Sequence, residues 1–420
     1  MTSRVVPSPH PSGRATTRAL YLGATAITTI GSAVGALEAA SIATTADPSH
    51  GAFLTAVVII ELLVASTLTV PHVPAMASRW GPQRLYALGM AATGVIWTVA
   101  ALAILVGLDP YPTLLVTVPL MGVTTGISTV MSPLFGRAYL SGDTMAGAYS
   151  RVTVVVGLSW AAGALVGGAL LQHVEPGFGL LVRGVLVVPL VIVLATVSPR
   201  GVAPVATLRA GGSWSTLAAN VRTPGPLRAV VALSCAVSIF VLPYLSLIVP
   251  IAAALRQVPL VSGAGLLMAG TALGEVLSPP LVSALQRRLP SLPAAAAAAI
   301  LCGGCLALFA LSSALLSQQL ELAVWVMIGV AFGAARYTVK SLELDAAVNC
   351  AVAEAEAIAA VSFVKTAVAP IGLLLCASLM TLVSVEAMLL VAFAGITASA
   401  AAVWRSASRP SARVADGVAD

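Results

Sequence analysis

The sequence predicts an all-α membrane protein in which twelve transmembrane helices form two halves of six helices each. Three observations support this fold class: the composition, a series of long apolar runs and the placement of the basic residues. Of the 420 residues, 59% are hydrophobic and only 9% are charged. A soluble domain carries about 25% charged residues, so this chain has too few of them to cover a surface exposed to water.

The apolar runs give the expected spans, because a helix needs about 20 mainly apolar residues to cross a bilayer. The first run is too long for the apolar part of a secretory signal peptide, and we expect it to be retained as a helix. The expected helices cover residues 19–43, 52–72, 86–107, 112–134, 148–172 and 179–198, followed by 228–254, 259–284, 293–316, 320–338, 355–381 and 385–405.

Basic residues gather on alternate connections between these runs. The two tails and every second connection hold 18 of the 21 Lys and Arg residues, whereas the opposite connections hold only Arg256. Loops rich in Lys and Arg stay in the cytoplasm. The distribution predicts a multi-pass protein of a bacterial inner membrane with both termini in the cytoplasm, and it explains the net charge of +6 without nucleic acid as a partner.

The longest connection divides the chain. It is rich in Gly, Pro, Ser and Arg, and Trp214, Leu217 and Val221 within it would share one face of a short helix on the inner leaflet; a plain linker is the alternative. The predicted organisation is a cytoplasmic tail (1–18), a first half (19–198), a cytoplasmic linker (199–227), a second half (228–405) and a cytoplasmic C-terminal tail (406–420).

The two halves also resemble each other in sequence. The stretch "AGAYSRVTVVVGLSWAAG" (146–163) aligns with "AEAIAAVSFVKTAVAPIG" (355–372), which places Gly163 over Gly372 at an offset of 209 residues. An offset of half the chain agrees with the division into six and six helices, as a duplicated transporter predicts.

The connection after the second helix carries a motif. "PAMASRWGPQRL" (74–85) resembles the G-x-x-x-D-R-x-G-R-R pattern of the major facilitator superfamily, with Arg79, Gly81 and Arg84 in place and Ser78 where the family has Asp. The resemblance covers essentially the whole chain. It implies the two-half fold and places Arg79 and Gly81 at contacts between the halves.

The fifth helix carries a second motif. "SWAAGALVGG" (159–168) is similar to the G-x-x-x-G-P-x-x-G-G pattern of family exporters and keeps Gly163, Gly167 and Gly168. Glycines at this spacing let helices approach closely, either between the halves or within one half. The fourth helix has Gly122 where drug/proton antiporters have an Arg. The chain as a whole resembles the macrolide-efflux-like exporters, whose motifs are often degenerate.

Five of the charged residues within or at the start of expected spans are the candidates for proton coupling or substrate binding: Glu38, Glu61, Arg151, Glu275 and Lys365. Arg183 also falls inside an expected span. Ionisable groups inside a membrane are costly and usually functional. A carboxyl group that meets water in one state and a dry surrounding in another can take up and release a proton.

Glu38 shares one helical face with Thr28, Gly31 and Gly35. This small, polar face should point into the bundle. In the resembling fold the first helix lines the central cavity, which makes Glu38 a candidate proton or cation site. The alternative is a carboxylate satisfied by a neighbouring helix.

The other four candidates form two expected ion pairs. In the resembling fold helix 2 faces helix 11 and helix 5 faces helix 8, which would pair Glu61 with Lys365 and Arg151 with Glu275 across the halves. Such pairs could open and close as the halves rock, or they could be permanent.

The cavity helices of the resembling fold offer hydroxyl and aromatic groups. We expect an apolar, aromatic wall with scattered hydroxyls, suited to a bulky amphipathic substrate, although the same aromatic side chains could simply pack in the core. The candidates are Thr124, Thr125, Ser128, Phe240, Tyr244, Trp325 and Phe332.

The sequence contains no phosphate-binding G-x-x-x-x-G-K loop, and we expect no cofactor and no metal site. The predicted function is a secondary transporter that exports small amphipathic or hydrophobic compounds by alternating access, coupled to protons, with the solute, protons and the lipid bilayer as partners. The alternatives are a nutrient-uptake symporter and a polytopic membrane enzyme. The scattered histidines and the acidic run at 343–356 supply no catalytic arrangement for an enzyme.

Overall fold

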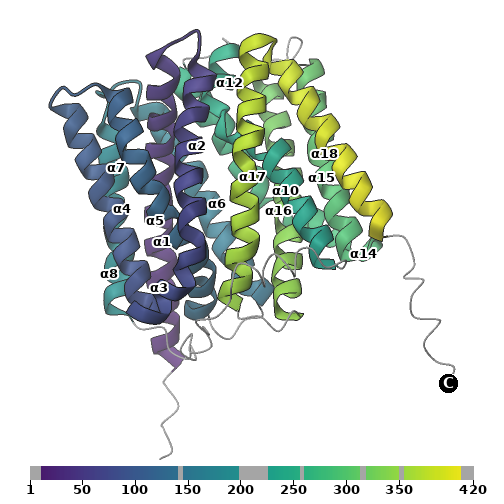
Figure 1. The fold of residues 1–420 in the computed structure, drawn as a ribbon, viewed down its shortest axis with the longest axis horizontal. Coiled ribbons are helices and arrows are strands. Elements are labelled where there is room, and N and C mark those ends of the chain that lie inside the picture. Colours follow the sequence, from purple (N-terminus) through teal and green to yellow (C-terminus); the bar gives the residue numbers. More distant parts are fainter. Residues whose placement is uncertain are drawn as a thin grey trace, which may run out of the picture.

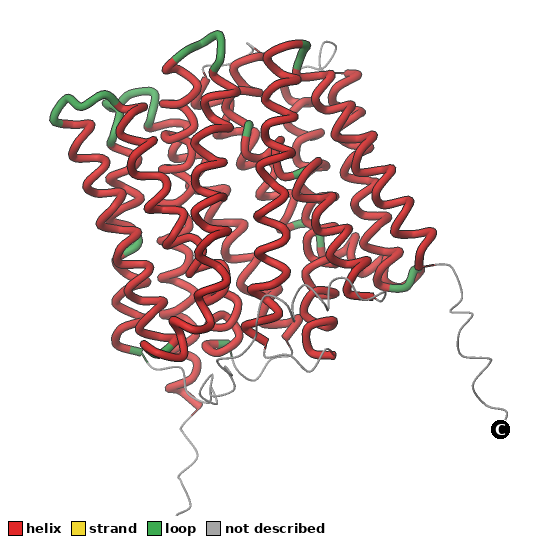
Figure 2. The backbone as a smooth tube through the Cα atoms, viewed as in Figure 1, coloured by secondary structure: helices red, strands yellow, loops and turns green. Residues whose placement is uncertain are grey.

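The computed structural model describes residues 11–140, 145–197, 226–255, 260–312, 318–349 and 354–407. Regular structure in these ranges is helical throughout (Figure 2). The predicted linker 199–227, with its possible helix around Trp214, lies outside the described residues apart from its last two.

The helices of the first half follow the expected order. They are α1 (Pro11–Ala46), α2 (Gly51–Thr69), the 3-10 turn η1 (Val70–His72), α3 (Val73–Trp80), α4 (Pro82–Leu105), α5 (Pro110–Tyr139), α6 (Met145–Leu170), α7 (Phe178–Leu186) and α8 (Val188–Thr196).

The second half continues in the same way. Its helices are α10 (Pro226–Phe240), α11 (Leu242–Ser246), α12 (Ile248–Leu255), α13 (Leu260–Val276), α14 (Pro279–Arg288), α15 (Ser291–Ser312), α16 (Gln318–Asn349), α17 (Glu354–Leu382) and α18 (Val385–Ala407).

Length and hydropathy allow eleven of the described helices to cross a membrane, and α13 with α14 makes a twelfth span if this bent pair is counted as one. The expected number of spans is therefore confirmed. Several helices extend beyond the predicted runs: α1 begins at Pro11 instead of residue 19, and α16 continues to Asn349 instead of ending at residue 338. An apolar run marks only the part of a helix within hydrocarbon, and the helix can continue into water with polar residues.

Proline explains the interrupted spans. The α13–α14 pair bends by 46° at a break followed by Pro279 and Pro280. The seventh span is divided at Val241 and Leu247, beside Pro243 and Pro250, and Pro189 follows the break between α7 and α8. Proline has no backbone N–H and its ring clashes with the preceding turn, so the helix bends or restarts there.

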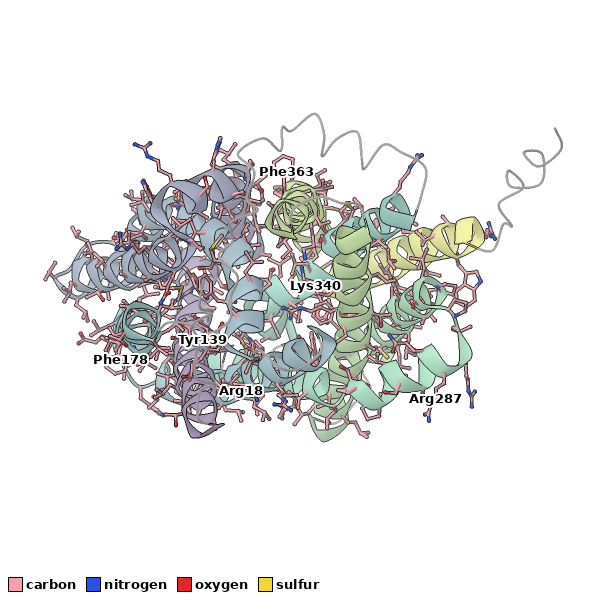
Figure 3. All side chains as sticks on the ribbon, turned by 90° about the horizontal axis from the view of Figure 1, so that it is seen from below. Arg18, Tyr139, Phe178, Arg287, Lys340 and Phe363 are labelled. Atoms are coloured by element: carbon pink, nitrogen blue, oxygen red, sulfur yellow. The ribbon has the colours of Figure 1, made fainter. Side chains whose placement is uncertain are left out.

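The helices form one bundle with the two halves side by side (Figure 1). The helix α1 begins and α18 ends on the same face, here called the near face; the opposite one is the far face. The halves meet where α2 packs on α17 and α6 packs on α13. In addition, α1 contacts α12 and α13. Seen from the near face, Lys340 lies close to the middle, while Phe178 and Arg287 lie at opposite sides of the molecule (Figure 3).

Glycines bring the helices of each half into close contact. A Cβ atom on Gly163 of α6 would lie 2.5 Å from the carbonyl oxygen of Ile30 in α1, so a side chain there would displace the neighbouring backbone. In the second half, a Cβ atom on Gly372 of α17 would meet the carbonyl oxygen of Ile239 in α10. Both residues of the second contact lie 209 positions after their counterparts, which confirms the predicted repeat.

Further glycine contacts repeat at almost the same offset. Gly126 of α5 faces Ser66 and Thr69 of α2, and Gly333 of α16 faces Glu275 and Ser278 of α13. A third pair of contacts places Gly94 against Val187 and Gly303 against Ile396. Each half therefore uses the same helix contacts. For most residues of the first half, the counterpart is the residue that lies 209 positions later in the chain.

The glycine contacts predict a position-specific effect on stability. Gly372→Ala should lower the free energy of unfolding by about 1–3 kcal/mol, because the added methyl group overpacks the α10–α17 contact. Thermal unfolding of the purified protein in detergent measures the effect.

Gly304→Ala in α15 is the matched control, since a Cβ atom at Gly304 meets nothing within 4 Å. It should leave the midpoint unchanged or raise it slightly, because alanine is the better helix former. Equal midpoints for Gly372→Ala and Gly304→Ala would contradict the proposed role of the contact.

Candidate functional site

Glu38 of α1 is buried, and its carboxyl group lies against the start of α7. Its Oε1 accepts a hydrogen bond from the backbone N–H of Gly177 at 2.7 Å, and its Oε2 accepts one from the N–H of Leu180 at 2.5 Å. The first N–H groups of a helix have no partner within the helix, and the helix dipole favours a negative charge there. Glu38 therefore caps α7 from a neighbouring helix, at a position where water does not supply the missing acceptors.

The whole face of α1 that carries Glu38 packs on α7. The Thr28 hydroxyl donates to the carbonyl oxygen of Leu186 at 3.2 Å, and Gly31 and Gly35 face Leu186 and Arg183. The expected position of this face along a central cavity is corrected, because its small residues admit a close helix contact within the first half.

Arg183 lies between α1 and α4. Its guanidinium carbon lies 4.5 Å from the centre of the Trp97 ring, a cation–π contact. Gly35 gives the side chain room, since a Cβ atom there would lie 2.6 Å from the Arg183 Cδ. Arg183 falls inside the expected span 179–198 and is not among the candidates for proton coupling or substrate binding proposed from the sequence.

Glu275 pairs with Arg336. The Arg336 Nη1 donates to the Glu275 Oε2 at 3.0 Å, between α13 and α16 of the same half. The expected partner, Arg151, lies exposed near the start of α6 in the other half, so this pairing is corrected. Gly333 explains the geometry, because it lets the α16 backbone approach Glu275 and Ser278 closely.

Arg336 is the residue that sequence reasoning missed. It falls within the predicted span 320–338, yet it is one of the 18 basic residues that the sequence analysis assigns to the tails and alternate connections. In the structure its side chain is 53% exposed, whereas the Glu275 side chain is 14% exposed. The position inside the apolar run was the signal that could have identified it.

Glu61 and Lys365 lie on the two helices that were expected to meet, α2 and α17. Both side chains are partly buried. The Glu61 Oε2 is buried and has no hydrogen-bond partner in the structure. Ile60 and Leu63, next to Glu61 on α2, pack against the core cluster that extends into the second half. Glu61 is thus a carboxyl group with one unsatisfied oxygen, on a helix that contacts the other half.

The aromatic candidates form a core cluster. Tyr244 lies 5.8 Å from Trp325 and 6.2 Å from Phe332 between ring centres, and Phe309 of α15 lies 5.3 Å from Trp325. Tyr244, Trp325 and Phe332 are all buried, and Phe240 packs on Gly395 of α18. These positions correct the expected cavity wall, because the rings fill the interior of the second half.

The hydroxyl candidates mainly join two helices of the first half. Thr93 of α4 donates to the Thr124 hydroxyl at 2.9 Å, and the Ser128 hydroxyl donates to the Met90 sulfur at 3.4 Å. Thr124 and Ser128 thus bind α5 to α4 and do not form the expected cavity wall. Thr125 is partly buried and its carbonyl oxygen accepts from Thr129.

The glycines of the fifth span divide their contacts. Gly163 and Gly167 face α1 within the first half, at Ile30 and Val34. Gly168 instead meets Gly265 of α13, so it is the residue of this motif that lies between the halves. The expected role between the halves is therefore corrected for the first two glycines.

The motif after the second span forms a turn. Gly81 joins α3 to α4 with a φ of +82°, a conformation that residues with a Cβ atom rarely adopt, and Arg79 is exposed. A Cβ atom at Gly81 would meet nothing within 4 Å, so the glycine is explained by the backbone turn and not by the expected packing between the halves.

Among the described residues, no group of three or more His, Cys, Asp and Glu side chains could hold a metal ion. The three candidate carboxyl groups lie in separate places: Glu38 at the start of α7, Glu275 beside Arg336, and Glu61 on α2.

Comparisons with known proteins find a similarity of fold. No protein-family model matches the sequence, and no curated protein matches it. The structure is similar to the nucleoside transporter NupG, with 12% identity, a TM-score of 0.66, and coverage of 94% of this chain and 100% of that chain.

A NupG variant gives 13% identity and a TM-score of 0.68 over 94% of this chain and 99% of that chain. The E. coli fucose:proton symporter FucP gives 11% identity and a TM-score of 0.62 over 93% and 99%. The chain has the twelve-helix, two-half fold of the major facilitator type that these transporters share.

The capping geometry predicts that Glu38 stabilises the protein. Glu38→Ala leaves two buried N–H groups without an acceptor, and each such group costs about 1–3 kcal/mol. The thermal unfolding midpoint should fall clearly for Glu38→Ala and by less for Glu38→Gln, which keeps an acceptor oxygen.

If transport by this protein depends on a proton gradient, Glu38→Gln should keep that dependence, because both Glu38 oxygens are used as acceptors for backbone N–H groups of the fold. If Glu38→Gln loses this dependence while its unfolding midpoint is unchanged, Glu38 takes part in proton coupling and the capping role alone does not explain it.

Proposed function

We propose that the protein is a secondary transporter that takes up a small organic solute together with protons. The fold supports this proposal, since the chain covers nearly the whole length of a nucleoside transporter and of a fucose:proton symporter. Their identity with this chain is too low to identify the solute. The near face would be cytoplasmic, as the distribution of Lys and Arg predicts.

Uptake is preferred to export for two reasons. The similar solved structures are a nucleoside transporter and a fucose:proton symporter, and a symporter moves its solute in the same direction as the protons. The glycine motif that favoured export is used for helix packing, and the contact at Gly163 is repeated at Gly372 in the second half. These glycines therefore serve the fold whatever the direction of transport.

The solute is expected to be polar instead of bulky and amphipathic. The amphipathic wall inferred from the sequence depended on Phe240, Tyr244, Trp325 and Phe332, and these rings pack within the second half. The guanidinium of Arg336 on α16 pairs with Glu275 and is 53% exposed, so a polar solute can approach it and accept hydrogen bonds from it.

Glu61 is the proposed proton-binding residue. Of the carboxyl groups in the described spans, Glu38 accepts from two backbone N–H groups and Glu275 accepts from Arg336, so both have partners that stabilise the charged form. Glu61 has a buried oxygen with no such partner. Because α2 contacts the other half, rocking of the halves would change the surroundings of Glu61 and so its proton affinity.

The coupling proposal predicts that Glu61→Gln separates transport from its driving force. Uptake of radiolabelled nucleosides and sugars into right-side-out vesicles with an imposed proton gradient would identify the solute. Glu61→Gln should then still equilibrate this solute but no longer concentrate it. Glu386→Gln at the start of α18 is the matched control and should transport as the unaltered protein does.

Accumulation by Glu61→Gln equal to that of the unaltered protein would remove Glu61 from the mechanism. A proton-driven release of solute from preloaded vesicles, without uptake, would instead support export. Lys365→Ala alone and with Glu61→Gln tests the proposed pairing of these residues, because recovery in the double variant requires that the two charges interact in one of the transport states.

A further inference from the structure

Arg183 is a cation within a transmembrane span that no acidic group contacts in the described structure. Its Nε is buried without a hydrogen-bond partner. The one described contact of its guanidinium group is the stacking on the Trp97 ring. A buried donor without an acceptor costs about 1–3 kcal/mol, and more when it is charged. A hydrogen-bond acceptor next to the Arg183 Nε would remove this cost.

Trp97 supplies a second donor at the same place. Its side chain is 1% exposed, and its Nε1 is also buried without a partner. The Nε of Arg183 is bonded to the guanidinium carbon, which lies 4.5 Å from the centre of the Trp97 ring, so the two donors lie within a few ångströms of this contact. Two neighbouring N–H groups and a positive charge favour the binding of an acceptor, preferably an anion, at this place.

The helices around Arg183 do not supply this acceptor. Its neighbours are α1, α4 and the rest of α7, and Glu38 is the single acidic residue in the sequence of these three helices. The two Glu38 oxygens accept from Gly177 and Leu180 at the end of α7. Arg183 therefore has no carboxylate partner on these helices, because Glu38 caps the start of α7 instead.

The duplication shows that the fold does not need the charge. The counterparts of Gly35, Trp97 and Arg183 at an offset of 209 residues are Tyr244, Leu306 and Ala392. All three are buried in one core cluster of the second half. The same helix contact is therefore closed there by an aromatic ring and two aliphatic side chains, without a cation and with a much smaller residue at the position of Arg183.

We propose that Arg183 and Trp97 form a binding site for an anion, either a halide or a phosphate group, in the first half of the protein. Arg183 is the sixth residue of α7, about 8 Å along the helix from its start at the far face. A phosphate could come from solution or from a lipid headgroup, since an arginine side chain at this depth extends toward the interface. The bound anion neutralises the cation and holds α1, α4 and α7 together.

Thermal unfolding of the full-length purified protein tests the site. At constant ionic strength, chloride, bromide or phosphate should raise the unfolding midpoint above its value in gluconate, because an anion that binds the folded state stabilises it. Arg183→Met should abolish the rise. Trp97→Phe keeps the ring but removes the N–H donor, and it should weaken the apparent affinity about tenfold.

Trp80→Phe is the matched control, because Trp80 is exposed on α3, and it should respond to anions as the unaltered protein does. Nanodiscs in gluconate distinguish the sources: a midpoint higher with phosphatidylglycerol than with a galactolipid, which has no phosphate, assigns the anion to a lipid headgroup. The same midpoint in every salt and lipid would overturn the proposal. So would an unaltered response of Trp97→Phe, which remains informative if Arg183→Met does not fold.

Discussion

Close backbone contact at glycine is the interaction on which the rest of this structure depends. Lipid tails are as apolar as leucine, so helices in a bilayer associate through packing and hydrogen bonds more than through burial of apolar surface. Gly163 and Gly372 place a helix directly on a neighbouring carbonyl oxygen in each half. The same kind of contact sets the polar geometry: Gly35 makes room for Arg183, and Gly333 brings α16 close to Glu275.

The second constraint is the cost of charge in the bilayer, and the chain meets it in different ways. Glu38 uses the N–H groups at the start of α7, which gain an acceptor that water would otherwise provide. Glu275 uses Arg336. Glu61 keeps an oxygen without a partner. A carboxylate with fixed partners changes its protonation only at a cost to the fold, whereas one without them is able to respond to its surroundings.

The sequence predicts the spans and the repeat because apolar length and similarity between halves are properties of the chain alone. It does not predict which way a helix face points. A face made of Thr28, Gly31, Gly35 and Glu38 suits a polar cavity and a tight helix contact equally well, and only the position of α7 decides between them. The partner of Glu275 could not be predicted either, because Arg151 lies near the start of one expected span, Arg336 lies near the end of another, and their helices both contact α13.

The duplication offers a way to separate what the fold requires from what function adds. At an offset of 209 residues, Glu38 corresponds to Leu247, Glu61 to Gly270, and Glu275 to Ser66. Each half folds around the same glycine contacts whether or not the charge is present, so the charges are not needed to form the contacts themselves. Two identical halves would respond identically to a proton or an anion on either side. The unequal distribution of charge is therefore the feature of this chain that could give its motion a coupling ion and a direction.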